Sequence, residues 1–189
     1  MSSIKITRKE EITNAAAHLF RVKGYAATTM RDLASEVGME AASLYNHIKS
    51  KQELLSEICD QMAVMYFNGL KDLPIAPVDQ IEKLIRHHIQ VNLTFPELAA
   101  VAEMEWGHLT EPSKSNFLRK RNQYELALKE MLRDAIASDE IAHGNLEISL
   151  YTILSALQWL HHWYRDERPI SPELVETEIV RLILNGLKR

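Results

Sequence analysis

The sequence of 189 residues predicts an all-α fold with a small N-terminal domain and a larger helical C-terminal domain. Three observations support this. Apolar residues recur at helical spacing, no segment shows sustained alternation of apolar and polar residues, and proline or glycine separates the periodic segments. Hydroxyl residues followed three positions later by an acid mark several helix starts. We expect about nine helices, with the domains over residues 1–50 and 51–189.

The first helix is predicted to begin after Thr7 and to end at Gly24. Thr7 and Glu10 form a capping box, in which a side-chain oxygen accepts an orphan backbone N–H. Its apolar residues at helical spacing are Ile12, Ala15, Ala16, Leu19 and Phe20. This helix would brace the two that follow it.

Two short helices joined by a tight turn are predicted next. Thr29 caps the first of them with Asp32 three residues on, and Gly38 can end it in the left-handed conformation. Residues 41–47 form the second short helix. A further Ser-x-x-Glu box over residues 50–53 starts a longer helix. The segment therefore has the pattern of a helix-turn-helix.

A helix-turn-helix places its second helix in the major groove of DNA. Residues 41–43 are small, so the start of this helix is slim enough for a groove about 12 Å wide. Tyr45, His47 and Lys51 carry groups suited to phosphate oxygens. The alternative is a plain helical hairpin whose polar residues are only solvated.

Residues 8 to about 60 resemble the N-terminal signature of the TetR family of bacterial repressors. The matching positions are Gly24, Thr28, Thr29, Arg31, Leu33, Ala34, Val37, Gly38, Leu44, Tyr45, His47, Ile48, Lys51 and Leu54. The resemblance implies an all-helical homodimer. Three N-terminal helices would bind DNA, and the remaining helices would bind a ligand and dimerise.

The resemblance also implies which residues contact a double-stranded operator. The DNA-binding set is Thr29, Arg31, Ala41, Ala42, Ser43, Tyr45, Asn46, His47 and Lys51. Arg31, Tyr45, His47 and Lys51 would contact backbone phosphates, and the residues at positions 41–43 and 46 would face the bases. Direct readout is expected to be sparse, because alanine offers only a methyl group, so DNA shape would contribute.

The distribution of charge agrees with this interpretation, although the net charge is −4. Residues 1–51 carry 8 Lys+Arg against 5 Asp+Glu, a net +3, whereas residues 52–189 carry 14 against 21, a net −7. The positive charge therefore lies where the motif lies. Operator binding should weaken as salt rises, because neutralised phosphates release counterions.

Other classes of function find little support in the sequence. No apolar run long enough for a membrane span and no signal-peptide core are present, which predicts a cytoplasmic protein. The resemblance to the TetR family implies that the protein is bacterial and is associated with the nucleoid when bound to DNA. The single cysteine, Cys59, excludes an internal disulfide. No catalytic motif, cofactor site or metal site is predicted; the pairs at residues 87–88 and 161–162 point apart on a helix and would need a third ligand.

The last two helices are predicted to form the dimer interface over Leu146–Arg165 and Pro172–Leu187. One apolar stripe comprises Leu146, Leu150, Ile153, Leu154 and Leu157, and the other Leu174, Val175, Ile179, Leu182, Ile183 and Leu187. Two such helices from each subunit would close a four-helix bundle and imply a near-palindromic operator. The alternative is that the stripes pack only within one subunit.

The middle helices supply large side chains for an effector cavity, although each of them can equally be ordinary core. The candidates are Trp106, Tyr124 and Trp159, which lie in the segments that form the family's pocket. A looser resemblance over residues 109–124 and 163–171 is to the branch of the family that senses acyl-CoA thioesters. It implies Arg121 and Trp163 as further ligand residues, with Arg119 or Lys120 also near the CoA phosphates. Aspartate follows residues 163–165 where that branch often has proline, and the bases can instead form a solvated face.

The sequence thus predicts a ligand-responsive transcriptional regulator, a homodimeric repressor released by a small apolar effector such as an acyl-CoA thioester. The alternative is a DNA-binding activator or architectural protein without a ligand. A third hypothesis is an enzyme or a helical protein-interaction bundle.

Overall fold

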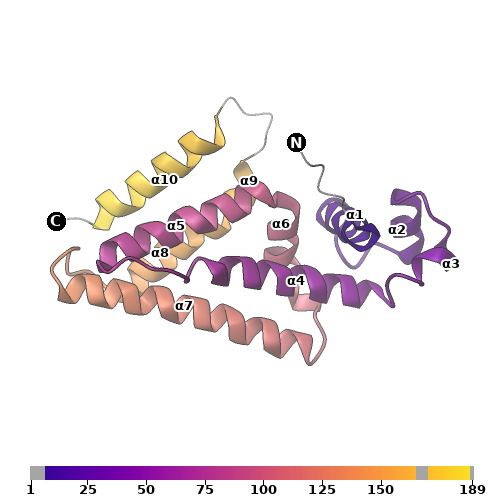
Figure 1. Ribbon diagram of the computed structural model, residues 1–189, viewed down its shortest axis with the longest axis horizontal. Helices are drawn as coiled ribbons and strands as arrows, with labels where there is room; N and C mark the ends of the chain where they lie inside the picture. Colours follow the sequence, from indigo (N-terminus) through magenta and orange to yellow (C-terminus); the bar gives the residue numbers. More distant parts are fainter. Residues whose placement is uncertain (1–6, 165–169, 188–189) are drawn as a thin grey trace. The chain divides into compact units, whose positions relative to one another are not determined.

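The computed structural model describes residues 7–164 and 170–187, and every regular element in these ranges is helical, which confirms the all-α prediction. The elements are α1 (Arg8–Lys23), α2 (Met30–Glu36), α3 (Ala41–Leu44), α4 (Lys51–Asn68), α5 (Pro77–Thr94), α6 (Pro96–Met104), the 3₁₀ helix η1 (Trp106–His108), α7 (Ser113–Ala137), α8 (Leu146–Gln158), α9 (Leu160–Trp163) and α10 (Pro172–Leu187) (Figure 1). None of the helices in the described ranges is long and apolar enough to cross a membrane.

The chain divides into two compact units. Unit 1 comprises residues 1–62 and 97–117, and unit 2 comprises residues 63–96 and 118–189. Unit 1 therefore contains the residues expected to bind DNA together with the start of α4, with α6 and with η1. The domain boundary after residue 50 stays a prediction.

Hydrogen bonds and backbone angles mark the predicted helix ends of unit 1. Thr7 with Glu10 and Thr29 with Asp32 both form complete capping boxes, and Gly38 has φ 62°. The third box is only half formed. The N–H of Glu53 donates to Ser50 Oγ at 3.1 Å, but the Glu53 carboxylate accepts the N–H of Lys49 instead of that of Ser50.

Helix α3 is shorter than predicted. Regular helix covers Ala41–Leu44, and residues 45–47 form a tight turn instead of continuing it. In that turn the N–H of Asn46 donates to the Ser43 carbonyl at 3.2 Å and that of His47 to the Leu44 carbonyl at 3.0 Å. A helix of one turn gains few hydrogen bonds of its own, so the burial of Leu44 and Ile48 sets the backbone here.

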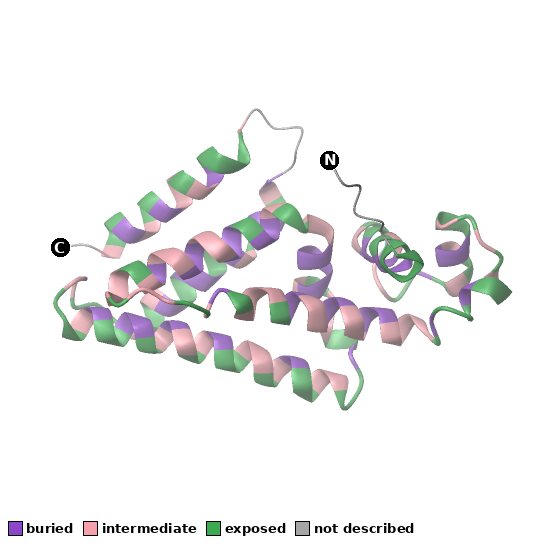
Figure 2. Ribbon diagram, in the orientation of Figure 1, coloured by how far each residue is buried: buried purple, intermediate pink, exposed green. Residues whose placement is uncertain are grey.

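Unit 2 is built around α5, which contacts α8, α9 and α10. Figure 2 shows buried and exposed positions recurring along α5 and α7, as expected for helices with one face in a core. The core of this unit contains residues from α5, α7, α8 and α10. Its larger members include Ile81, Ile85, Leu128, Leu132, Leu150, Leu154, Leu157 and Leu184.

Of the two apolar stripes predicted for the dimer interface, the one on α8 needs a correction. Leu150, Ile153, Leu154 and Leu157 of α8 are buried in the core of unit 2, as is Val175 of α10. The stripe is therefore the inner face of α8, which the neighbouring helices of the same chain cover. Exposed apolar residues of α8 lie outside its predicted stripe, namely Ile148 and Tyr151, whereas Leu174 and Leu182 of the predicted α10 stripe are exposed.

The predicted helix over residues 146–165 is interrupted. Trp159 ends α8 and begins α9, and regular helix stops at Trp163. Arg165, the predicted end of this segment, lies outside the described residues.

Candidate nucleic-acid interface

The residues expected to face DNA lie at the exposed end of the helix-turn-helix. Thr29, Arg31, Ala42, Ser43, Tyr45, Asn46 and His47 are exposed, while Ala41 and Lys51 are half-buried. More than half of the Tyr45 surface, 54%, is accessible although tyrosine is largely apolar. The side chains of Arg31, Tyr45 and His47 have no hydrogen-bond or ion-pair partner in the described parts of the chain. Their polar groups are therefore available for phosphate oxygens.

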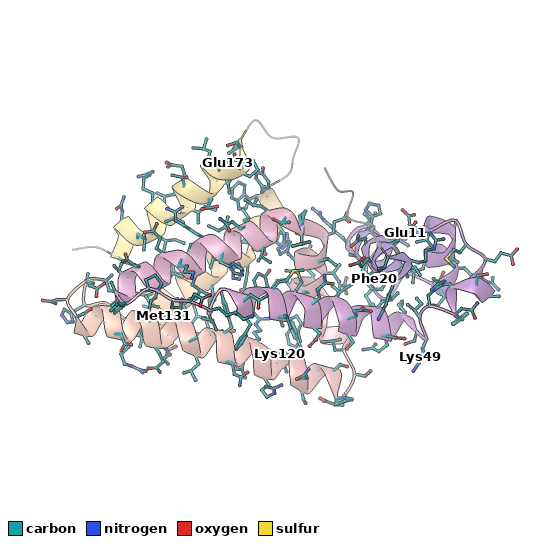
Figure 3. All side chains as sticks on the ribbon, viewed as in Figure 1. Glu11, Phe20, Lys49, Lys120, Met131 and Glu173 are labelled. Carbon is teal, nitrogen blue, oxygen red and sulfur yellow. The ribbon has the colours of Figure 1, made fainter. Side chains whose placement is uncertain are left out.

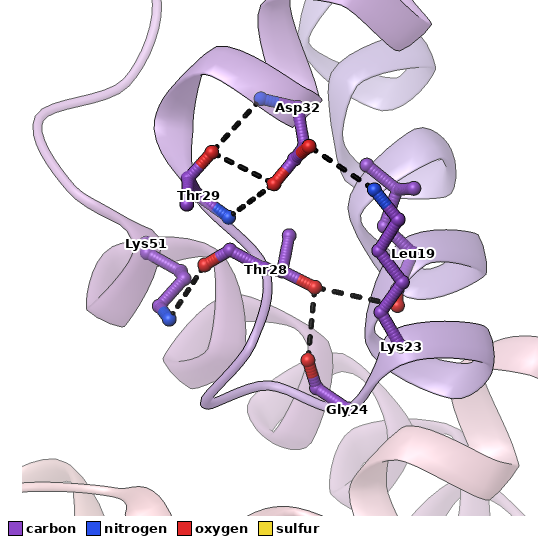
Figure 4. A network of polar contacts seen from close by, with 7 residues as sticks. All are labelled: Leu19, Lys23, Gly24, Thr28, Thr29, Asp32 and Lys51. Atoms are coloured by element: carbon purple, nitrogen blue, oxygen red, sulfur yellow. Dashed lines mark hydrogen bonds and ion pairs between the residues drawn. The ribbon is translucent and has the colours of Figure 1, made fainter.

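The Thr29 side chain is engaged within the protein (Figure 4). Its hydroxyl donates to Asp32 Oδ2 at 2.7 Å and accepts the N–H of Asp32 at 3.1 Å. Hydrogen bonds from the hydroxyl and the N–H of Thr29, and then from Lys23, lower the pKa of Asp32 to about 2. Thr29 therefore fixes the start of α2, the first helix of the motif.

Two contacts between residues further apart in the sequence join α2 to α1. Lys23 Nζ lies 3.0 Å from Asp32 Oδ1, and the Arg8 guanidinium donates to the Val37 carbonyl at 3.1 Å. These contacts join both ends of α2 to the ends of α1. Helix α1 therefore braces α2, the first of the two helices that it was predicted to brace.

Lys51 makes contacts that the sequence did not predict. Its ammonium donates to the carbonyls of Tyr25 at 2.5 Å, Thr28 at 2.8 Å and Ala26 at 3.3 Å. It also lies 4.3 Å from the centroid of the Tyr25 ring, within the range of a cation–π interaction. The N–H donors expected to meet a phosphate are therefore directed at the loop between α1 and α2.

Tyr25 is a central residue of unit 1 that sequence reasoning missed. Its N–H donates to Glu105 Oε1 at 3.2 Å, and its hydroxyl donates to Gln52 Oε1 at 2.8 Å. The His108 ring stacks on the Tyr25 ring with centroids 5.3 Å apart. Burial raises the pKa of Tyr25. Tyr25 lies in a loop, where no periodic pattern marks a residue as buried.

The residues predicted to bind an effector are distributed over both units. Trp106 belongs to η1 in unit 1, where its ring lies 6.3 Å from that of Phe117. Tyr124 is buried in unit 2, whereas Trp159 is 61% exposed. Arg121 is half-buried and pairs with Glu125 at 3.2 Å. The remaining candidate, Trp163, packs against the core of unit 2.

A groove with mixed chemistry lies between α4 and α7 in unit 2. Its volume is about 300 Å³, and Ala63, Val64 and Phe67 provide an apolar wall. Lys71, Arg119 and Lys120 are cationic, and no carboxylate is among the described residues that line it; Lys120 is labelled in Figure 3. Such a lining suits a ligand with both an apolar part and an anionic group.

A buried polar cluster accompanies Tyr124 in the core of unit 2. His88 Nδ1 lies 2.9 Å from the Tyr124 hydroxyl, and the His88 ring stacks on Tyr66 at 4.1 Å. Tyr66 donates to Asn92 Oδ1, and the Asn92 amide donates to the Leu157 carbonyl. Burial lowers the pKa of His88 to about 3 and raises that of Tyr124. The sequence could have predicted that His88 and Asn92 are buried, because their spacing places them on the same face of α5 as its buried apolar residues.

The histidine pairs do not build a metal site in the described residues. No group of three or more histidine, cysteine, aspartate or glutamate side chains there converges closely enough to hold a metal ion. His88 instead bonds to Tyr124, and His162 stacks on Trp159 with ring centroids 3.8 Å apart.

Two protein-family models match the chain. The model described as "Bacterial regulatory proteins, tetR family" matches residues 12–58, which contain the helix-turn-helix. The model described as "Tetracyclin repressor-like, C-terminal domain" matches residues 74–187. Together they cover both parts of the chain.

Relatives of known function and solved structures agree with these matches. The transcriptional repressor KstR2 of Mycolicibacterium smegmatis is 26% identical over 195 aligned residues, covering 96% of this chain and 91% of that protein. The structure of the ketosteroid transcriptional regulator KstR2 of Mycobacterium tuberculosis has a TM-score of 0.88 at 21% identity, with 97% and 96% covered. AibR, solved with isovaleryl coenzyme A and operator DNA, has a TM-score of 0.82 at 22% identity, with 93% and 97% covered.

Proposed function

The chain belongs to the TetR family of bacterial transcriptional regulators, and from this premise we propose that it is a homodimeric repressor released from a near-palindromic operator by a small effector. Relatives such as KstR2 are transcriptional repressors, not enzymes. The observation that carries the proposal is the exposed set of polar side chains around α3. It combines a slim helix start with phosphate-seeking groups that have no partner within the described chain.

The proposed operator contacts divide into two kinds. Arg31, Tyr45 and His47 bind backbone phosphates and set the register of the motif. Ser43 and Asn46 read base edges, and Ala41 and Ala42 allow close approach to the groove floor and contact methyl groups. Few direct base contacts are available, so the sequence-dependent shape of the operator adds specificity.

The proposed dimer uses the exposed faces of α8 and α10. On α8 the exposed positions recur at helical spacing and include Ile148, Tyr151, Ser155 and Ala156, and the exposed C-cap Trp159 continues this face. On α10 the large apolar residues that are exposed are Leu174 and Leu182. Exposed apolar side chains at helical spacing suit a protein–protein contact, and the small residues Ser155 and Ala156 permit close packing of two helix pairs.

We propose an acyl-CoA thioester as the effector class. The groove between α4 and α7 supports it, because Lys71, Arg119 and Lys120 suit the phosphates of the coenzyme A group and the apolar wall at residues 63–67 suits the acyl chain. AibR, which has the same fold, was solved with isovaleryl coenzyme A.

The effector proposal is tested by operator binding in the presence of acetyl-, isovaleryl- and octanoyl-CoA, with free coenzyme A for comparison. At least one thioester should weaken operator affinity about tenfold, which requires ~1.4 kcal/mol of coupling. Arg119→Gln combined with Lys120→Gln should reduce this response. Arg133→Gln, an exposed cation further along α7, should not.

Two results would count against the effector class. A response unchanged in the groove double variant would mean that the thioester binds elsewhere. Operator binding that no thioester affects would favour the alternative function, an activator or architectural protein without such a ligand.

A further inference from the structure

The loop of residues 24–29 connects α1 to α2, and it is held from two sides within unit 1. On one side Lys51, the first residue of α4, donates to the carbonyls of residues 25, 26 and 28. On the other side Glu105 accepts the N–H of Tyr25, and His108 stacks on its ring. Helix α4 and the segment 105–108 therefore meet at one loop.

The Lys51 ammonium has three N–H donors, and the loop offers three carbonyl acceptors for them. While the loop has this conformation, no donor remains for a phosphate oxygen. The Tyr25 ring lies over the same ammonium and stabilises its charge. Moving Lys51 to a phosphate would leave several loop carbonyls without this donor.

The loop determines where the DNA-binding helices lie. Thr28, buried at its centre, donates from its hydroxyl to the Gly24 carbonyl at 2.9 Å and the Leu19 carbonyl at 3.3 Å. The next residue, Thr29, caps α2 (Figure 4). Helix α2 in turn packs against α3. A displacement of the loop therefore displaces the start of α2 and, through it, α3.

We propose that this loop is the point at which residues 105–108 control operator affinity, and that Lys51 is a positioning residue within it instead of a phosphate ligand. The proposal rests on the operator binding proposed above. Glu105 and His108 hold Tyr25, Tyr25 and Lys51 hold the loop, and the loop fixes α2 and α3 in the DNA-binding arrangement. A shift of η1 thereby reaches the recognition segment without any contact to DNA.

The role of Lys51 is tested with Lys51→Met, which keeps a long unbranched side chain and removes the ammonium group. Lys49→Met is the matched control, because Lys49 is exposed and lies in the turn just before α4 (Figure 3). Without DNA, amide hydrogen exchange of residues 24–29 should speed up about tenfold in Lys51→Met and stay unchanged in Lys49→Met. Equal exchange in both variants and the wild type would overturn the proposal.

Operator binding separates positioning from phosphate contact. Lys51→Met should weaken affinity about tenfold with the slope of log K against log salt matching that of Lys49→Met. If the slope for Lys51→Met is shallower than the slope for Lys49→Met by about one per subunit, Lys51 contacts a phosphate. That result would overturn its positioning role. Tyr25→Leu removes the aromatic ring but leaves the backbone carbonyls of the loop in place. It should also weaken operator affinity without changing the salt slope.

The link to η1 is tested by a double-mutant cycle between Lys51→Met and Glu105→Ala. If each substitution alone weakens operator binding about tenfold and the two act independently, the double variant should lose about a hundredfold in affinity. If both act through the loop, the loss should stay below about thirtyfold. Glu97→Ala is the control, because Glu97 joins α6 to His18 of α1 at 2.8 Å without touching the loop. Its effect should multiply with that of Lys51→Met.

Multiplicative effects of Lys51→Met and Glu105→Ala would overturn the link. A wild type that binds no operator would instead refute the proposed function, while the exchange measurement would still report on the loop.

Discussion

Three donors converge on the Asp32 carboxylate at the start of α2. The N–H and the hydroxyl of Thr29 lie 2.8 and 2.7 Å away, and Lys23 Nζ lies at 3.0 Å. All three interactions favour the ionised form, which explains why the pKa falls to about 2 from 3.8. The Asp32 carboxylate therefore takes part both in the N-cap of α2 and in the ion pair with Lys23 of α1.

This arrangement predicts a loss of stability in acid. Because the folded-state pKa is lower than the unfolded value, the contribution of Asp32 is complete above about pH 4 and is lost as the pH falls to about 2. The gap in melting temperature between the wild type and Asp32→Asn should narrow over that interval. A gap that stays constant from pH 5 to pH 2 would contradict this role of Asp32.

Tyr45 and Ser43 should respond differently to truncation. Tyr45→Ala should weaken binding to all DNA sequences by about fivefold, as expected for the loss of a phosphate hydrogen bond of ~1 kcal/mol. Ser43→Ala should mainly change the preference at one operator base pair, by ~1–3 kcal/mol. Binding to a panel of single-base operator variants distinguishes the two. A changed preference with Tyr45→Ala at unchanged general affinity would refute its assignment.

At the scale of helices, the caps made the N-terminal elements predictable. Thr7, Thr29 and Gly38 act through local hydrogen bonds and backbone angles, which a short stretch of sequence specifies. The length of α3 was not predictable in this way, because tertiary burial of Leu44 and Ile48 sets it. Tyr25 and Glu105 are 80 positions apart, and no local pattern predicts such a contact.

The C-terminal helices show the limit of reading a single apolar stripe. The α8 sequence carries apolar residues on two faces, and the more regular face is the core of its own chain. Periodicity reports that a face is apolar, but it does not report whether the same chain or a second chain covers it. The exposed positions of Tyr151 and Trp159 became visible only in the folded structure.

Tyr151→Glu should therefore dissociate the proposed dimer. Tyr151 lies near the middle of α8 and is 54% exposed, so a charge there is tolerated in the monomer but is buried in the proposed interface. The cost should be at least ~2 kcal/mol, typical of a central interface residue. Sedimentation velocity over a range of concentrations measures the shift, and Leu126→Glu, equally exposed on α7, is the control. A wild-type dimer affinity in Tyr151→Glu would contradict this interface.

At the scale of the whole molecule, the distribution of charge along the chain is the one expected for a DNA-binding regulator of the TetR family. The net positive charge lies within residues 1–51 and the remainder is acidic, so the N-terminal part is the one whose net charge suits DNA. The fold and the DNA-binding segment could be predicted because helix caps and a dense motif are local features. The effector candidates were less predictable, since Trp106 and Tyr124 belong to different compact units.

Selection of binding sites from a pool of random double-stranded DNA tests the central claim most directly. A homodimeric repressor with this helix-turn-helix should enrich a near-palindromic sequence whose half-sites lie one helical turn, about 10 base pairs, or a multiple of it apart. Enrichment should decline as salt rises from about 50 to 200 mM, because phosphate contacts release counterions. A pool that yields no motif, or one without two-fold symmetry, would contradict the account.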